Sequence, residues 1–263
     1  MTEWSYRGRW ALVTGASSGI GEAFARELAR RGMNLVLAAR RIDKLTALAI
    51  ELENAHGIEA DAVIADLAQP GAAAALWKDA SDGQEIALVI NNAGFGLKGR
   101  FDELPVERQS EMIQVNCVAV LELSHLALTE MRRRGGGAII NVASIAAYQP
   151  IPMLATYAAT KAFVVTLTEA LAEEARGSGV RVLTLNPGPV ATEFQSVAGT
   201  SVNRKTVGIR TPEQVVADAL DGVERGRRTV TPGLINRLST YAVRALPRGP
   251  VIRIAKMVMT KLR

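Results

Sequence analysis

Short apolar runs alternate with longer segments of helical periodicity along the first 190 or so residues. Six runs are almost continuously apolar, as expected for strands of a parallel sheet buried on both faces. Between them, apolar residues recur three or four positions apart, and several of these segments end in glycine, a helix stop signal. The alternation predicts an α/β fold, a Rossmann-like doubly wound parallel sheet with helices on both faces. The predicted strands are WALVTG, NLVLAAR, DAVIADL, ALVINNAG, GAIINVAS and VRVLTLNPG.

The pattern changes after Thr192, where a polar, aperiodic segment is followed by more helix-like sequence. We interpret residues 1–263 as one domain, with its core motifs in 9–192 and a substrate loop and C-terminal helical extension in 193–263. Two amphipathic helices separated by Pro247 and Pro250 are expected to pack on the protein and cover a substrate entrance. Contact with a membrane surface is the less favoured alternative. Their apolar sets are Leu234, Ile235, Leu238, Tyr241, Ala242, Ala245 and Leu246, then Val251, Ile252, Ile254, Ala255, Val258, Met259 and Leu262.

Composition narrows the class of protein. Of the 263 residues, 48% are hydrophobic and 22% charged, which is typical of a globular chain, and the net charge of +5 is modest. The N-terminus lacks the apolar core of a signal peptide, and no uninterrupted apolar run approaches a membrane span. Cys117 is the single cysteine, so no internal disulfide can form, and we expect a cytoplasmic location. His56 and His125 are isolated from other metal-ligating residues, so no metal is expected.

The segment TGASSGIG lies between the first predicted strand and the first predicted helix. Its glycines, Gly15, Gly19 and Gly21, permit a tight turn and a close approach of backbone to ligand. The hydroxyls of Ser17 and Ser18 can donate hydrogen bonds, and a helix N-terminus favours a phosphate. An ordinary strand–helix turn is the alternative, but the placement favours a dinucleotide.

The second predicted strand ends in Ala38, Ala39, Arg40 and Arg41, without a carboxylate. An acidic residue at this end commonly binds the adenosine ribose, whereas an arginine accommodates a 2′-phosphate. The sequence therefore favours NADP(H) over NAD(H). A solvated arginine pair is the alternative, and Asp43 is a weaker candidate for the ribose.

A third set of residues, Ser144, Tyr157 and Lys161, offers catalytic chemistry. Tyr157 and Lys161 are four positions apart, so they share one face of the predicted helix. An ammonium beside a phenol lowers the tyrosine pKa, which makes the tyrosine a usable proton donor and acceptor. Ser144, at the end of a strand, can hydrogen-bond a carbonyl oxygen. Without its context, a tyrosine and lysine at this spacing would be read as surface decoration.

These motifs occur in one order: the glycine loop, NNAG, the asparagine of IQVN, Ser144, Tyr157 with Lys161, and NPGPVAT. In this arrangement, from about Arg9 to Thr192, the chain resembles the short-chain dehydrogenase/reductase family. The resemblance implies that Tyr157 is the acid in carbonyl reduction and the base in alcohol oxidation. Lys161 would hold the nicotinamide ribose and lower the pKa of Tyr157, Ser144 would orient the carbonyl, and Asn116 would hold a water.

The resemblance also implies the cofactor-binding residues. Family members that prefer NAD carry an aspartate where Ala39 stands, and Arg40 matches a basic position of NADP-preferring members. Thr192 would bond the nicotinamide carboxamide. The whole expected set is Gly15, Ser17, Ser18, Gly19, Ile20, Gly21, Arg40, Asp66, Leu67, Asn92, Ala93, Gly94, Tyr157, Lys161, Pro187, Gly188, Val190 and Thr192.

The expected function is NADPH-linked reduction of a ketone or aldehyde, or the reverse oxidation of a secondary alcohol, on a small, lipophilic substrate. A 3-oxoacyl reductase that acts on acyl thioesters is an alternative, although the C-terminal sequence departs from bacterial 3-oxoacyl-carrier-protein reductases and so argues against acyl-carrier-protein substrates. A non-catalytic NADP-sensing protein and a membrane-peripheral interaction module are further alternatives. The arginines at 132–134 suit a helix end rather than nucleic acid. The two longest predicted helices, about 106–134 and 156–176, carry more apolar surface than one sheet face needs, and the family resemblance implies that they pair across a two-fold axis; a homodimer or homotetramer is therefore expected.

Overall fold

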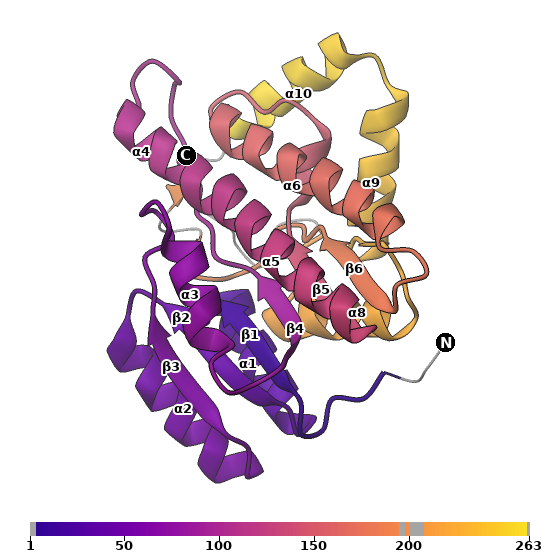
Figure 1. The fold of residues 1–263 in the computed structure, drawn as a ribbon. Coiled ribbons are helices and arrows are strands. Elements are labelled where there is room, and N and C mark those ends of the chain that lie inside the picture. The colour runs from indigo at the N-terminus through magenta and orange to yellow at the C-terminus, as the bar shows by residue number, and fades with distance from the viewer. Residues whose placement is uncertain (1–3, 195–197, 200–207, 262–263) are drawn as a thin grey trace.

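Seven parallel strands form the centre of the molecule (Figure 1) in a computed structural model that describes residues 4–194, 198–199 and 208–261. The strand order is β3-β2-β1-β4-β5-β6-β7, so the chain changes direction across the sheet between β1 and β4. In open α/β sheets, ligands bind at this switch point, outside the carboxyl ends of the strands. The strands are β1 Trp10–Thr14, β2 Asn34–Ala39, β3 Ala60–Ile64, β4 Ile86–Asn91, β5 Gly137–Val142, β6 Val180–Leu185 and β7 Thr229–Val230.

Helices cover both faces of the sheet. One face carries α1 (Gly19–Arg30), α2 (Ile42–His56) and α8 (Pro212–Glu224), and the other carries α3 (Ala72–Ala80), α5 (Ala119–Arg134) and α6 (Ala155–Glu174). Helix α4 (Val106–Ile113) runs through a π-helical turn, Gln114–Val118, into α5. A 3-10 turn, Ile145–Tyr148, precedes α6. Helices α9 (Leu234–Ala245) and α10 (Arg248–Lys261) lie together at one corner of the molecule in Figure 1.

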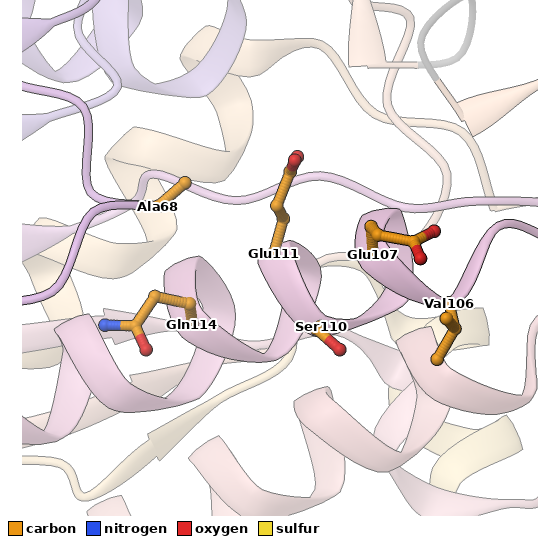
Figure 2. Close-up of a pocket in the computed structure, with 6 residues that line it drawn as sticks. All are labelled: Ala68, Val106, Glu107, Ser110, Glu111 and Gln114. Atoms are coloured by element: carbon orange, nitrogen blue, oxygen red, sulfur yellow. The ribbon is translucent and has the colours of Figure 1, made fainter.

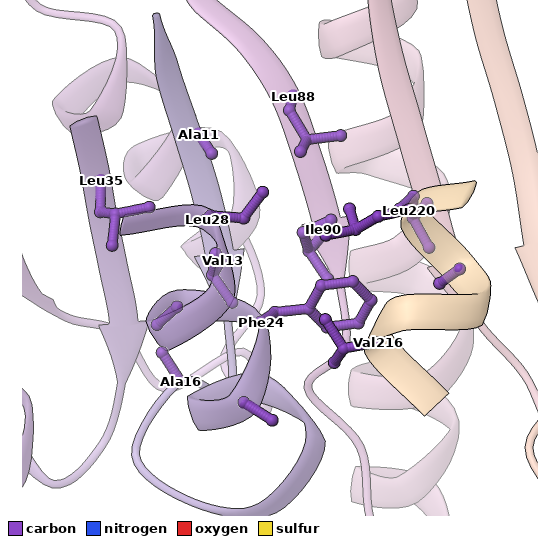
Figure 3. Packing of buried hydrophobic residues seen from close by; sticks show 14 of the residues in the cluster. Ala11, Val13, Ala16, Phe24, Leu28, Leu35, Leu88, Ile90, Val216 and Leu220 are labelled. Carbon is purple, nitrogen blue, oxygen red and sulfur yellow. The ribbon is translucent and has the colours of Figure 1, made fainter. Parts of the chain in front are cut away.

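The apolar strands are buried because both of their faces meet helices. Along β1, Ala11 and Val13 face one hydrophobic cluster and Leu12 faces the other. Figure 3 shows the first cluster, in which Phe24 of α1 lies between the sheet and Val216 of α8. Alternate side chains of one strand thus serve two cores, which explains why these strands are continuously apolar in sequence.

The structure confirms the predicted doubly wound parallel sheet and all six predicted strands. The two-residue strand β7 was not predicted, because so short a strand has no detectable periodicity. The predicted long helix over 106–134 is interrupted by the π-helical turn. By length and composition, the segment Val106–Arg134 is the one helix of the described chain that could cross a membrane. Its side chains Leu123, Ala127 and Met131 pack on the sheet, as expected for a core helix.

Helix α9 contradicts the expected packing of its apolar face on the protein. Asn236 and Thr240 are buried, whereas the predicted apolar face points outward. The reason is a hydrogen-bonded anchor: the Asn236 amide nitrogen donates to the backbone oxygens of Gly208 and Pro232, both at 2.9 Å. The exposed members of the predicted set are Leu234, Ile235, Leu238, Tyr241, Ala242, Ala245 and Leu246.

Helix α10 follows the expectation in part. Val251 and Ala255 are buried, and Met259 packs against an apolar cluster that includes Tyr157. Ile252 is half-buried, whereas Ile254 and Val258 are exposed. The predicted contact of Leu262 lies outside the described residues, as does much of the segment between Phe194 and Gly208. One side of α10 therefore packs on the protein and the adjoining side faces outward.

Candidate active site

A cleft of about 600 Å³ opens at the carboxyl ends of the central strands, beside the switch point between β1 and β4. It brings together almost the whole set of residues predicted from sequence. Gly21 and Asn116 are the exceptions, and both support residues that form the wall. The predicted residues that line it are Gly15, Ser17, Ser18, Gly19, Ile20, Arg40, Asp66, Leu67, Asn92, Ala93, Gly94, Ser144, Tyr157, Lys161, Pro187, Gly188, Val190 and Thr192.

A second hollow of about 440 Å³ lies beside this cleft, between the loop at Ala68 and one side of α4 (Figure 2). Ala68 and Glu111 line both spaces. The other side chains of the hollow, which include Glu107 and Gln114, are not among the residues predicted to act. The hollow therefore extends one rim of the cleft and adds no catalytic group to it.

The glycine loop is held close to the end of β4, which leaves no room for side chains. Gly15 and Gly19 have φ values of +66° and +62°, which L-residues with side chains rarely adopt. At Gly21, an added Cβ would lie 2.2 Å from the Gly15 carbonyl oxygen and 2.5 Å from Asn92 Nδ2. Asn92 Nδ2 donates to the carbonyl oxygen of Thr14 at 3.0 Å. The loop thus presents backbone and the start of α1 to the cleft, which suits a phosphate.

Thr14 is a supporting residue that the sequence analysis did not identify. Its hydroxyl accepts hydrogen bonds from the backbone nitrogens of Asn92 and Ala93, both at 3.0 Å, and donates to the Ile90 carbonyl at 3.2 Å. One buried side chain therefore joins the ends of β1 and β4, where the cleft opens between them. The only sequence signal for this role was its position directly before the first glycine.

Two arginines at the end of β2 occupy different environments. Arg41 reaches the glycine loop, where its guanidinium donates to Ser17 Oγ at 3.0 Å and Ser18 Oγ at 2.9 Å. It also pairs with Glu193 at 2.9 Å. Arg40 lines the cleft and has no ion pair among the described residues. The sequence favours Arg40 as the phosphate ligand and indicates no separate role for Arg41, whose guanidinium supports the glycine loop in the structure.

The three predicted catalytic side chains converge from two elements. Ser144 follows β5 and accepts a hydrogen bond from the Ala146 backbone nitrogen at 3.1 Å. Tyr157, in the first turn of α6, shares a side-chain hydrogen bond with Ser144. One turn later, Lys161 Nζ donates to the Val142 carbonyl oxygen at 2.8 Å and lies 5.9 Å from the centre of the tyrosine ring. This arrangement places a hydroxyl pair and a buried cation at one point of the cleft.

Asn116 supports the loop after β4. It is fully buried in the π-helical turn, where its Oδ1 accepts from the Phe95 backbone nitrogen at 3.1 Å. Its Nδ2 donates to the Phe95 carbonyl and to Thr160 Oγ1, both at 3.0 Å. The Asn116 side chain therefore fixes the backbone beside Gly94 against α6. Its expected role in holding a water stays a prediction.

Burial is the main cause of the shifted pKa values of Tyr157 and Lys161. It raises the pKa of Tyr157 to about 12, although the hydrogen bond with Ser144 acts in the opposite direction. Burial also lowers the pKa of Lys161 to about 8. The expectation of a lowered Tyr157 pKa is thus wrong for the protein alone, because loss of hydration outweighs the hydrogen bond with Ser144. At neutral pH the tyrosine carries its proton.

Comparison with known proteins places this geometry in a family. Residues 9–202 match the sequence profile described as short chain dehydrogenase. The chain belongs to the short-chain dehydrogenase/reductase family. Relatives include the 7beta-hydroxysteroid dehydrogenase of Collinsella aerofaciens, which is 34% identical over 81% of this chain and 82% of its own. The very-long-chain 3-oxoacyl-CoA reductase of Anas platyrhynchos is 31% identical over 97% of this chain and 81% of its own.

Solved structures agree with the assignment. A short-chain dehydrogenase from Sphingobium yanoikuyae, in complex with NADPH, has a TM-score of 0.81 and 31% identity, and the match covers 92% of this chain and 97% of that one. A family member from Burkholderia phymatum in complex with NAD has a TM-score of 0.82 and 25% identity, with 96% and 97% covered. This short-chain dehydrogenase/reductase is therefore an oxidoreductase acting on CH–OH groups with a nicotinamide cofactor.

The part of the cleft beyond Tyr157 is apolar in this short-chain dehydrogenase/reductase. The ring of Phe194 lies 5.5 Å from the ring of Tyr157, and Met259 reaches the same cluster from α10. The sequence predicts a lipophilic substrate and places Met259 in a helix that covers the substrate entrance, but it does not indicate Phe194 as a pocket residue. The C-terminal extension contributes to the active site through Met259, as expected of a helix near the entrance.

Two of the remaining candidate residues, Cys117 and Asp66, have surroundings that can be described. Cys117 is buried, and burial raises the pKa of its thiol to about 11, so it is a poor nucleophile. Asp66 accepts hydrogen bonds from the Ala68 backbone nitrogen at 3.3 Å and from Gln69 at 3.2 Å. Within the described residues, no group of three or more His, Cys, Asp or Glu side chains could hold a metal ion.

Proposed function

We propose that the protein is an NADPH-dependent reductase of lipophilic ketones or aldehydes, with oxidation of the corresponding alcohol as its reverse reaction. One observation carries the proposal. The protonated, buried hydroxyl of Tyr157 lies between a glycine-lined cleft that suits a dinucleotide and an apolar pocket that suits a hydrophobic substrate. Reduction needs a proton donor at this junction, and a tyrosine with a raised pKa is protonated at neutral pH.

The side chains have distinct tasks in this proposal. Ser144 and Tyr157 donate hydrogen bonds to the carbonyl oxygen, and Tyr157 transfers its proton as negative charge develops on that oxygen. Lys161, with a pKa of about 8, is mostly charged at neutral pH and stabilises the tyrosinate that remains. The apolar pocket excludes water from the reacting atoms. A bound nicotinamide cofactor supplies the hydride.

The glycine cradle supports the cofactor assignment. Added Cβ atoms at Gly15 and Gly21 would meet neighbouring atoms at 2.9 Å and 2.2 Å, so the loop surface is bare backbone. Ala39 provides no carboxylate for a ribose, and Arg40 offers to the cleft a guanidinium that has no ion pair within the described part of the chain. A guanidinium can bind a phosphate through two hydrogen bonds. These features favour NADPH over NADH.

A panel of carbonyl compounds tests the proposed activity. Purified protein is mixed with NADPH and steroid ketones, long-chain ketones, aliphatic aldehydes or small polar ketones, and cofactor absorbance is followed. We expect turnover of apolar ketones and its loss in Tyr157→Phe, with NADPH binding retained in that variant. Tyr241→Phe, the same change at an exposed tyrosine that does not line the cleft, is the matched control. Turnover by Tyr157→Phe at the native rate would contradict the proposal.

A second candidate is reduction of 3-oxoacyl thioesters of coenzyme A. The avian reductase aligned over 97% of this chain supports it, as does the apolar pocket, which suits an acyl chain. Ten of the 31 Lys and Arg residues follow Glu224, so phosphates of coenzyme A would meet positive charge near the C-terminal extension. Adding 3-oxoacyl-CoA esters to the panel separates the two substrate classes.

Location and assembly complete the proposal. We place the enzyme in the cytoplasm, where a reducing environment suits its single cysteine. A homo-oligomer is supported by exposed apolar side chains on the two longest helical segments, among them Val106, Leu121 and Phe163. Pairing of these segments across a two-fold axis would cover those side chains.

A further inference from the structure

The apolar side of the amphipathic helix α9 faces outward. Leu234, Ile235, Leu238 and Tyr241 are 57–61% exposed, while Asn236 is only 3% exposed. The buried asparagine is used as an anchor, since its amide group also fills the space beside Gly188, where an added Cβ would lie 2.4 Å from Asn236 Nδ2. The outward direction of the apolar side is therefore fixed by specific contacts of the polar side with the active-site wall.

Helix α10, at the same corner of the molecule, also exposes apolar side chains. Ile254, Met257 and Val258 are 47–58% exposed on the side next to the buried residues Val251 and Ala255. We call the exposed apolar residues of these two helices and of the turn between them the C-terminal apolar surface: Leu234, Ile235, Leu238, Tyr241, Leu246, Ile254, Met257 and Val258. Soluble monomers rarely leave so many large apolar side chains exposed together without a partner.

The charged side chains on helices α9 and α10 are all basic. After Glu224 the chain contains ten Lys and Arg residues and none of the 26 Asp and Glu residues of the protein. Arg237, Arg244, Arg253 and Lys256 are exposed on the two helices themselves. The two helices thus carry only positive side chains, whereas the chain up to Glu224 has more acidic than basic residues.

The basic side chains and the exposed apolar side chains together indicate which kind of partner fits the C-terminal apolar surface. A second copy docked through the same surface would bring two positive rims together, which is unfavourable. An anionic lipid bilayer offers charge complementarity to the rim and an apolar layer for the exposed side chains. We propose that α9 and α10 dock this protein on anionic membranes, with the C-terminal apolar surface inserted at the level of the headgroups.

Docking in this way would place the substrate pocket at the membrane. Met259, on the same helix as Ile254 and Met257, lines the cleft. A lipophilic substrate could thus pass from the bilayer into the pocket alongside α10 without crossing water. This consequence rests on the proposed function, whereas membrane docking itself does not.

Vesicle co-sedimentation tests docking without using enzyme activity. The full chain is mixed with vesicles of phosphatidylcholine alone, or of phosphatidylcholine with 30% phosphatidylglycerol, in about 0.1 M and 0.5 M NaCl. We expect binding to the anionic vesicles that weakens in high salt. Equal binding to both vesicle types, or none to either, would overturn the proposal.

Two independent variants identify the surface. Leu238→Glu with Ile254→Glu should weaken binding at least tenfold, whereas Ile50→Glu, at an exposed isoleucine of α2, should leave it unchanged. Arg237→Gln, Arg253→Gln and Lys256→Gln together should weaken binding about a hundredfold, at about 1 kcal/mol for each charge. Arg7→Gln, Lys78→Gln and Arg133→Gln, which are also exposed, form the matched control.

Circular dichroism and light scattering complete the design. Folded variants that bind vesicles as tightly as the native protein would overturn the proposal. So would a native dimer that Leu238→Glu with Ile254→Glu converts to a monomer, because the surface would then be an interface between copies. If the glutamate variant does not fold, the glutamine variant decides the outcome, since it changes only exposed charged side chains.

Discussion

Substitution of Gly21 by alanine tests how tightly the glycine loop is packed. Gly21 is buried in the first turn of α1, and an added Cβ would lie 2.2 Å from the Gly15 carbonyl oxygen, 2.8 Å from its carbonyl carbon and 2.5 Å from Asn92 Nδ2. The first two atoms are backbone, and Asn92 is held by its hydrogen bond to Thr14. The methyl group can therefore be accommodated only if the loop moves away from α1.

The expected magnitude follows from two opposing effects. Alanine in a helix gains up to about 1 kcal/mol over glycine, whereas overpacking typically costs about 1–3 kcal/mol. We expect Gly21→Ala to lose about 1–2 kcal/mol of unfolding free energy. Displacement of the loop should also weaken NADPH binding at least tenfold, which corresponds to about 1.4 kcal/mol.

Gly249→Ala is the matched control, because Gly249 is also helical and has no atom within 4 Å of an added Cβ. It should be neutral or stabilising and leave NADPH binding unchanged. Urea denaturation gives the unfolding free energies, and quenching of protein fluorescence gives the dissociation constants. A Gly21→Ala protein with native stability and an NADPH dissociation constant within threefold of native would refute the packing argument.

Three further predictions concern the cofactor, protonation and assembly. Arg40→Asp should weaken NADPH binding at least tenfold and leave NADH binding unchanged. Arg41→Ala should weaken the binding of both cofactors, because the glycine loop loses its hydrogen bonds to the guanidinium. If Arg40→Asp weakened the binding of both cofactors equally, the assignment of Arg40 to the 2′-phosphate would be contradicted. Lys161 has a folded-state pKa of about 8, below its unfolded value of 10.5. The unfolded state therefore binds the Lys161 proton more tightly than the folded state does. We expect the unfolding free energy of the native protein, minus that of Lys161→Met, to rise by about 1–2 kcal/mol from pH 8 to 9.5. A difference that does not change with pH in urea titrations would contradict this. Light scattering should show a dimer that Leu121→Glu dissociates and Ile50→Glu does not; a native monomer at micromolar concentration would rule out the predicted pairing.

The sheet and most of the cleft could be predicted from the sequence because residues close together in the chain determine them. Continuous apolar strands report burial on two faces, and glycines report the backbone conformation at Gly15 and Gly19. The direction in which an amphipathic helix faces is not local. Periodicity located the apolar side of α9, but the hydrogen bonds of Asn236 with Gly208 and Pro232 determine that this side faces outward.

The same limit applies within the active site. The spacing of Tyr157 and Lys161 correctly predicted that they share a face of α6, yet it could not show how deeply both are buried. Burial raises the pKa of Tyr157, which reverses the direction predicted from the neighbouring charge alone. The role of Arg41 was equally hidden, because its partners Ser17, Ser18 and Glu193 come from distant parts of the chain.

Isotope transfer tests the central claim, that this active site moves a hydride between a nicotinamide and a carbonyl carbon. The protein is incubated with an apolar ketone from the panel and NADPH deuterated at C4 of the nicotinamide, with each of the two stereoisomeric labels in turn. Mass spectrometry then locates deuterium in the alcohol product. Our account predicts one deuterium on the carbinol carbon from one of the two labels, and at least a hundredfold less labelled product with Tyr157→Phe. Alcohol formed without deuterium from either label would contradict it.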